Sequence, residues 1–433
     1  MAVLWLAGGA SRGNAAGQIV VRAAAFLALI VMAMFGRRAP TVSARPIWGA
    51  LVASIALAVL QLLPLPAGLA HLLPGRVAIG TPIGVEVRSW SIVPGATLNA
   101  LFALVVPVAV LVLVTRLDER ERGWLPWIVL VMTVASIFVG LLQFSGVAFD
   151  NPLINDSPGA VSGTFSNRNH FALFLALGCL AVPVCLFTQR HSLRWRGPVG
   201  LGLLLLFTLT ILASGSRAGL IAGGLAIGIV ALLSWHGVRR NLRGRPRWVF
   251  PAVVAAAASV FALFIVISLA AGRAVSIDRS LSVDIEQDMR SRALPTVWTM
   301  VRDTFPAGNG LGSFDSMFRR HEPETLLKPS WFNQAHNDIM DVALSAGLPG
   351  LLLLATALIW WVWASIGVWR NLADRQYQQA RLGSAMVLLV VISSVFDYPA
   401  RTPMMMAMIV FAGFWLSSRV KGNNVSTLPA PCL

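Results

Sequence analysis

The segment Asn333-Gln-Ala-His336-Asn-Asp338 places a histidine among amides and a carboxylate, directly before the long apolar run 339–369. It also closes the longest polar stretch of the chain. Histidine gains and loses a proton near neutral pH, and a neighbouring carboxylate such as Asp338 can orient or tune the ring. These residues predict a general base, His336, supported by Asn337 and Asp338. A hydrogen-bonded loop histidine without a catalytic role is the alternative.

Two arginines stand at the ends of other apolar runs. Arg168 lies in Gly163-Thr-Phe-Ser-Asn-Arg-Asn-His170, and Arg217 lies in Ala213-Ser-Gly-Ser-Arg-Ala-Gly219. Guanidinium groups bind phosphate oxygens in a planar fork, and ionisable residues at membrane depth are functional by default. We predict that both arginines bind an anionic substrate, with Asn169 in support. The alternatives are an arginine whose charge snorkels to the membrane surface, a polar boundary loop, and, for His170, an interfacial histidine.

The composition predicts that a lipid bilayer surrounds most of the chain. Of the 433 residues 57% are hydrophobic and 12% charged, too few charges to cover a soluble domain. The apolar segments are continuous rather than short and alternating, which predicts an all-α polytopic membrane protein with about 11 or 12 transmembrane helices. The eleven candidate spans are 18–36, 48–64, 98–115, 124–146, 169–188, 199–213, 218–235, 249–271, 339–369, 382–397 and 403–418. The run ending at Trp369 is longer than a bilayer requires, which predicts a tilt or a start outside the membrane.

The positions of the basic residues predict the orientation of the chain. Short basic loops alternate with the remaining loops, and the positive-inside rule assigns the basic ones to the cytoplasm. They are Arg37–Arg38, Arg116–Arg122, Arg190–Arg196, Arg239–Arg247, Arg370–Arg381 and Arg419–Lys421. The loops predicted to be external are 65–97, 147–168, 214–217, 272–338 and 398–402. Because the net charge of +16 is spread over short loops, we expect no nucleic-acid partner.

Counting spans predicts that the candidate residues converge. Two predicted spans lie between Arg168 and Arg217, and two more lie between Arg217 and His336. All three residues therefore emerge at one face, which is predicted to be external. The loop 272–338 adds Arg290 and Arg292 on a stretch with amphipathic helical spacing that stops at Phe305-Pro306. Two unit charges about 4 Å apart attract by about 4 kcal/mol at an effective dielectric near 20, so a few arginines would hold a diphosphate firmly. The pattern predicts a site for an anionic headgroup whose tail stays in lipid.

Neither a metal nor another cofactor is expected. No two histidines have metal-ligand spacing, and no Asp-x-Asp cluster is present to hold a divalent ion. Cys179, Cys185 and Cys432 suggest no disulfide. The N-terminus lacks a cleavable signal pattern, so we expect insertion through the first internal span, with an interfacial helix before it as one possibility.

The sequence resembles the O-antigen ligase/polymerase superfamily of bacterial envelope glycosyltransferases over most of its length. The motifs that carry the resemblance are Gly163–Phe171, Ser214–Gly219, Arg292 with Phe305-Pro306 and Gly310–Phe314, and Ala335–Asp338 leading into Ala346–Gly350. The segments Gln61-Leu-Leu-Pro-Leu-Pro66 and Phe396-Asp-Tyr-Pro-Ala-Arg401 also resemble members linked to exopolysaccharide or O-antigen assembly. In many members the loop arginine lies closer to the tryptophan than Arg292 does to Trp298, which leaves Arg290 and Arg292 as alternatives.

The resemblance implies a helical fold like that of C-type glycosyltransferases. It implies one membrane domain over residues 1–433, with the family core at about 165–370 and one large external loop at 272–338. The implied reaction is metal-independent, inverting transfer of a glycan from undecaprenyl diphosphate at the outer face of the bacterial inner membrane. By the same resemblance, Arg217 and Arg292 hold the diphosphate, Arg168 lines the site and His336 activates the acceptor hydroxyl.

Several functions remain open from the sequence. A polymerase extends a lipid-linked repeat unit, a ligase transfers the glycan to lipid A–core, and a third branch glycosylates proteins. The exopolysaccharide-like flanking motifs favour a polymerase slightly, and a chain-length regulator is a possible partner. A membrane transporter is the alternative from another class, although the polar groups gather at one face and not at mid-span.

Overall fold

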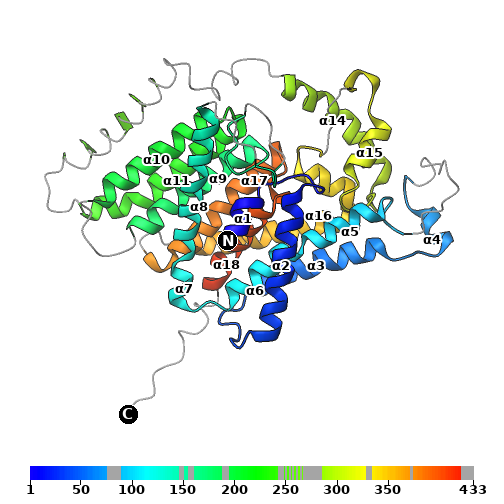
Figure 1. The fold of residues 1–433 in the computed structure, drawn as a ribbon, viewed down its shortest axis with the longest axis horizontal. Coiled ribbons are helices and arrows are strands. Elements are labelled where there is room, and N and C mark those ends of the chain that lie inside the picture. The colour runs from blue at the N-terminus through cyan, green and yellow to red at the C-terminus, as the bar shows by residue number, and fades with distance from the viewer. Residues whose placement is uncertain are drawn as a thin grey trace, which may run out of the picture.

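The chain is described from a computed structural model (Figure 1). It describes residues 1–75, 89–145, 151–154, 160–187, 195–241, 285–327, 334–370 and 374–420, with scattered positions between 248 and 266. Within these residues the regular elements are helices. Nine of the described helices are long and apolar enough to cross a membrane. The prediction of an all-α polytopic membrane protein is confirmed.

The helices match the predicted spans closely. The candidate spans are α2 (Ala16–Phe35), α3 (Arg45–Leu62), α5 with α6 (Pro94–Ala103, Val105–Thr115), α7 with α8 (Glu119–Gly123, Leu125–Phe144), α9 (Arg168–Phe187), α10 (Arg196–Ala213), α11 (Arg217–Asn241), α16 (Asp338–Trp369) and α17 (Gln378–Phe396). A shorter apolar helix, α18 (Pro403–Val420), covers the last predicted run. The predicted span 249–271, the basic segments 188–194 and 242–247, and Cys432 lie largely or wholly outside the described residues.

Helix α9 forms the centre of the bundle. It is the most deeply buried candidate span, and α8, α10, α11 and α17 pack around it (Figure 1). Close approach of α11 depends on Gly219, because a Cβ there would lie 2.4 Å from the Cβ of Ala172 on α9. Cys179 and Cys185 are buried free thiols on α9. The core thus fixes α9 and α11 side by side, and with them the positions of their first residues.

Hydrogen bonds between loops show which helix ends share a face. At one end, Arg38 pairs with Glu121 at 2.8 Å and Thr41 donates to the carbonyl of Leu117. At the other end, Gly17 donates to the carbonyl of Leu153, and Gln143 accepts from Gly163. The two basic segments near Arg38 and Glu121 therefore meet at one end of the bundle, as the predicted alternation requires.

Helix α16 is broken near its start. Gly347 adopts φ 57° and ψ −148°, and a Cβ at this position would lie 2.1 Å from the carbonyl oxygen of Pro306. Leu348 donates its N–H to that same carbonyl at 2.8 Å. Residues 348–369 rise about 33 Å, close to the hydrocarbon thickness of a bilayer. The run 339–369 was predicted to be longer than a bilayer requires. The extra residues form a separate first segment, 338–346, before the break.

The described part of the large loop folds against that first segment. Helix α14 (Ile285–Thr304) is amphipathic, as predicted, and buries one face against α15 (Phe314–His321) and Leu344. The glycine-rich turn that follows donates from Asn309 and Gly310 to the carbonyls of Leu344 and Ser345. Gln61, fully buried, binds both Leu311 and Ser345. The loop is therefore clamped to the helix that begins just after His336.

The N-terminal helix packs one face against the bundle and leaves the other exposed, with Met1, Val3 and Leu6 accessible. Helix α1 (Ala2–Ala7) buries Leu4 and Ala7, and the Trp5 indole donates to Ser136 of α8 at 3.0 Å. An interfacial helix before the first long span stays a prediction. Short helix α4 (Ala67–Leu72) and three 3-10 turns complete the described elements: Glu324–Leu326, Arg375–Tyr377 and Pro399–Arg401.

Candidate active site

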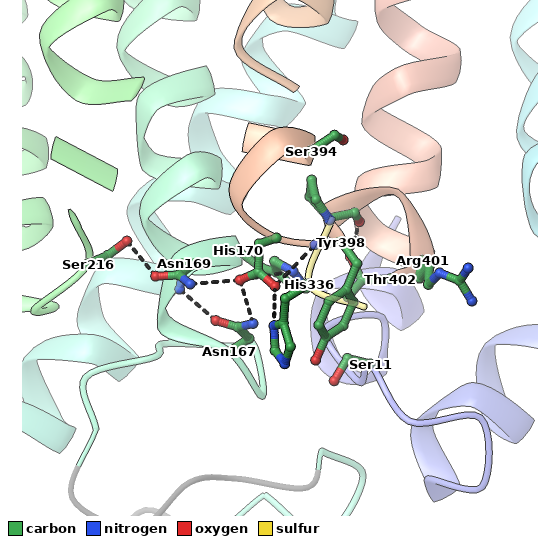
Figure 2. Close-up of polar contacts among 12 residues, drawn as sticks. Ser11, Asn167, Asn169, His170, Ser216, His336, Ser394, Tyr398, Arg401 and Thr402 are labelled. Carbon is green, nitrogen blue, oxygen red and sulfur yellow. Dashed lines mark hydrogen bonds and ion pairs between the residues drawn. The ribbon is translucent and has the colours of Figure 1, made fainter. Parts of the chain in front are cut away.

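His336 contacts a buried carboxylate on a distant part of the chain. Its Nδ1 lies 3.1 Å from Oδ1 of Asp397, in the turn between α17 and α18. The Asp397 side chain is 2% exposed, whereas that of His336 is 14% exposed. His336 has a left-handed backbone, with φ 49°, a conformation that non-glycine residues adopt rarely and often at functional sites. The pair thus presents a partly accessible imidazole backed by a buried anion (Figure 2).

Both oxygens of Asp397 are hydrogen-bonded. The backbone N–H of Tyr398 donates to Oδ1 at 3.1 Å. The side-chain amides of Asn167 and Asn169 donate to Oδ2 at 2.9 and 2.7 Å. A buried carboxylate is costly without such donors. The asparagines therefore keep Asp397 in place and at the correct angle for His336.

Three helices begin around this carboxylate, each with a side-chain N-cap. Asn167 accepts from the N–H of Asn169 in α9, Ser216 from the N–H of Gly219 in α11, and Asn337 from the N–H of Met340 in α16. Asn and Ser are preferred caps, so these residues fix where each apolar run becomes helical. Ser216 also donates to Asn169 at 2.7 Å, which joins α11 to the network (Figure 2). Helix N-termini carry partial positive charge, so their convergence favours an anion.

Two of the predicted arginines come directly after two of these capping residues in the sequence. Arg168 is the first residue of α9 and Arg217 the first of α11, and both are half-buried. Because Asn169 and Ser216 bind each other, the predicted meeting of these two helix ends and the His336 segment at one face is confirmed. Arg292 is an exposed residue of α14. The side chain of Arg290 lies outside the described residues.

Asp338 does not occupy the position expected for it. Its Oδ2 accepts from the hydroxyl of Ser394 at 2.7 Å, and its Oδ1 lies 4.0 Å from Nε of Arg401. Arg401 in turn pairs with the buried Asp341 at 2.6 Å. The left-handed turn at His336 directs its ring to the α17–α18 turn and away from the first turn of α16, which carries Asp338. The carboxylate next to His336 is therefore Asp397 and not Asp338.

A second histidine borders the same carboxylate. His170 is 1% exposed, and its Nε2 lies 3.9 Å from Oδ2 of Asp397. The ring of Tyr398 lies between the two histidines, with centroids 5.2 Å from His170 and 5.0 Å from His336. His170 is thus a buried neighbour of the Asp397 carboxylate. In the sequence, Asp397 and Tyr398 stand in a flanking motif and were not predicted as site residues. The signal for Asp397 is a carboxylate at the end of an apolar run, at the same predicted face as His336.

Within the described residues, no group of three or more His, Cys, Asp or Glu side chains could hold a metal ion. The chemistry that this arrangement offers directly is proton transfer at His336, next to a junction that favours anions. Asp397 would fix the ring, and the helix ends would bind negative charge.

Comparison with known families identifies part of the chain. Residues 201–355 match the model of a family described as O-antigen ligase. This segment is similar to that family. The match agrees with the resemblance to the O-antigen ligase/polymerase superfamily noted in the sequence, and it points to a glycosyltransferase-like membrane enzyme. A search of curated proteins found no match to the chain.

The matched segment covers only part of the candidate site. It runs from α10 into α16, so it contains Arg217, Arg292 and His336. Arg168, Asn169 and Asp397 lie outside it. The hydrogen bonds to Asp397 therefore join the matched segment to flanking helices α9 and α17, which complete the surroundings of His336.

Proposed function

We propose that this protein transfers a glycan from undecaprenyl diphosphate to an acceptor hydroxyl at the outer face of the bacterial inner membrane. The observation that carries the proposal is the His336–Asp397 pair at the junction of three helix N-termini. Transfer from a lipid diphosphate needs a base for the acceptor hydroxyl and positive charge for the diphosphate. A histidine beside three helix N-termini could supply both. The O-antigen ligase match supports the same reaction class.

In the proposed reaction His336 acts as general base. Its Nδ1–H donates to Asp397, which makes Nε2 the nitrogen that accepts the proton of the acceptor hydroxyl. The oxygen attacks the anomeric carbon and forms the new C–O bond with inversion. The bond from that carbon to the diphosphate breaks, and undecaprenyl diphosphate leaves with the electron pair. The imidazolium then returns its proton to solvent or to the product phosphate.

Negative charge grows on the diphosphate as it leaves, and the proposed site would stabilise it. Arg217 and Arg168 stand in the first turns of α11 and α9, where helix dipole and guanidinium act together. Arg292, or Arg290, would contribute from α14. The proposal involves neither a metal nor another cofactor, since arginines and helix ends supply the positive charge.

Two acceptors fit this chemistry. We favour a polymerase, whose acceptor is another lipid-linked repeat unit, because the motifs around Gln61 and Asp397 resemble those of exopolysaccharide-linked members. A ligase that uses lipid A–core is the second candidate. A polymerase would work with a chain-length regulator as a possible partner.

The experiment that tests this proposal uses purified protein in liposomes with undecaprenyl-diphosphate-linked repeat units as the sole substrate. A ladder of longer lipid-linked chains identifies a polymerase. Transfer that appears only after lipid A–core is added identifies a ligase. Absence of both contradicts glycan transfer and leaves the transporter interpretation, for which uptake of the labelled substrate into the liposome lumen is the readout. Arg217→Ala should reduce transfer, and Arg217→Lys should reduce it less.

A further inference from the structure

Arg22 is a charged residue within a membrane-spanning helix. It lies in the second turn of α2, and no other residue of that helix is charged. The side chain is half-buried, and α2 begins at the same end of the bundle as the candidate active site, where Gly17 bonds to Leu153. An ionisable group at membrane depth is costly and is retained for a function.

The described partners of Arg22 are neutral. Its two terminal nitrogens donate to the side-chain carbonyls of Asn99 on α5 and Gln18 on α2, the latter at 3.2 Å. Its Nε is buried and makes no hydrogen bond within the described part of the chain. Amide oxygens satisfy N–H groups but do not cancel the positive charge. A half-buried guanidinium held by neutral groups favours a nearby anion.

The amides that contact Arg22 are themselves held firmly. Gln18 is 3% exposed and donates to the carbonyl of Ala10 at 2.7 Å. The Asn99 amide packs so closely on Gly13 that a Cβ there would lie 2.5 Å from it. Arg12, in the same N-terminal turn, is exposed and adds a second cation. The guanidinium is thus fixed in advance, which is how proteins hold a phosphate.

We propose that the α2–α5 junction binds the phosphate of a lipid headgroup through Arg22, with Arg12 alongside. The acyl chains would rest on the exposed apolar surface of α2, which includes Ile19 and Phe26. The site is separate from the one around His336, because the N-terminal turn lies between them. Ser11 of that turn bonds to Ser166 at 2.8 Å, next to Asn167, which binds Asp397.

Lipid retention tests the proposal without any transfer reaction. Wild type, Arg22→Gln and Asn99→Asp are placed in phosphatidylcholine nanodiscs with a minor fraction of phosphatidylglycerol, and the phosphatidylglycerol retained after extraction is measured by native mass spectrometry. Asn99→Asp keeps the shape of the site but supplies an internal carboxylate for Arg22. Both variants should retain about tenfold less phosphatidylglycerol than wild type, because each loses one charge-assisted contact with the headgroup.

Arg37→Gln is the matched control, since it removes an exposed arginine just past the opposite end of α2. It should retain phosphatidylglycerol as wild type does. Equal retention in wild type, Arg22→Gln and Asn99→Asp would overturn the proposal. Because the readout needs no glycan substrate, failure here is distinct from failure of the proposed transferase function.

Two further arms identify the source of the phosphate. Inorganic phosphate that displaces the lipid shows that the phosphate itself is recognised; displacement only by lipid shows that the tail contributes. In the transfer assay, a raised KM for acceptor in Arg22→Gln with kcat unchanged assigns the site to an acceptor lipid. Unchanged kinetics together with lost phosphatidylglycerol assign the site to a structural phospholipid. Either kinetic result supports a lipid phosphate at Arg22.

Discussion

His336 and Asp397 lie 61 residues apart in the chain, yet their side chains meet at 3.1 Å across the junction of α16 with the α17–α18 turn. Asp397 is fixed by two asparagines from the start of α9. The orientation of the imidazole therefore depends on helices that lie outside the matched segment as well as on those within it.

Asp397→Asn should lower kcat for glycan transfer by about 10- to 100-fold, the usual cost of removing the partner that orients a functional histidine. The amide can present its NH₂ to the ring and so favour the wrong tautomer, while the shape of the site is kept. Steady-state transfer in liposomes measures the effect. Asp315→Asn, an exposed carboxylate on α15, is the control and should transfer normally.

Arg401→Gln should destabilise the protein by about 3 kcal/mol, because it leaves the buried carboxylate of Asp341 without its cation. Thermal unfolding in detergent gives the change in Tm. The double variant Arg401→Gln with Asp341→Asn should recover most of the loss, since neither charge then remains buried alone. A double variant no more stable than Arg401→Gln would show that the ion pair is not the cause.

Gly9→Ala should reduce transfer while the protein is still inserted in the membrane. A Cβ at position 9 would lie 1.8 Å from the carbonyl oxygen of Thr164, and the carbonyl of Gly9 accepts the N–H of Ser166. The substitution would push away the loop that carries Asn167 and Asn169. Gly49→Ala is the matched control, because no atom lies within 4 Å of a Cβ there. Equal activity of the two variants would show that the N-terminal turn does not position the site.

The orientation is testable by cysteine labelling in a Cys432→Ser background. A cysteine in place of His321, which is exposed on α15, should react with an impermeant reagent added from outside. A cysteine in place of Asn241, at the end of α11, should react only after the membrane is opened. The reverse pattern would place the candidate site at the cytoplasmic face.

Much of the fold follows from local sequence. Apolar runs of bilayer length predicted the helices, and the caps Asn167, Ser216 and Asn337 stand where three of them begin. Counting spans predicted that Arg168, Arg217 and His336 emerge together, because a chain that crosses a bilayer returns to the same face only after a second crossing.

The remaining features depend on packing between distant segments. Asp338 is two residues from His336, so the sequence favoured it over Asp397, but the left-handed backbone of His336 turns the ring away. The break in α16 at Gly347 arises from the approach of Pro306, about forty residues earlier. The packing of α1 against the bundle likewise depends on the contact of Trp5 with α8.

The most direct test of the central claim is chemical rescue of His336→Ala in the liposome transfer assay. If His336 is the general base, the variant should lose about 10²- to 10⁴-fold in kcat, and added imidazole should restore part of that rate. Arg217→Ala, which lacks a different group, should gain nothing from imidazole. Transfer by His336→Ala at nearly the wild-type rate, with equal protein in the membrane, would contradict the assignment of His336 as the catalytic base.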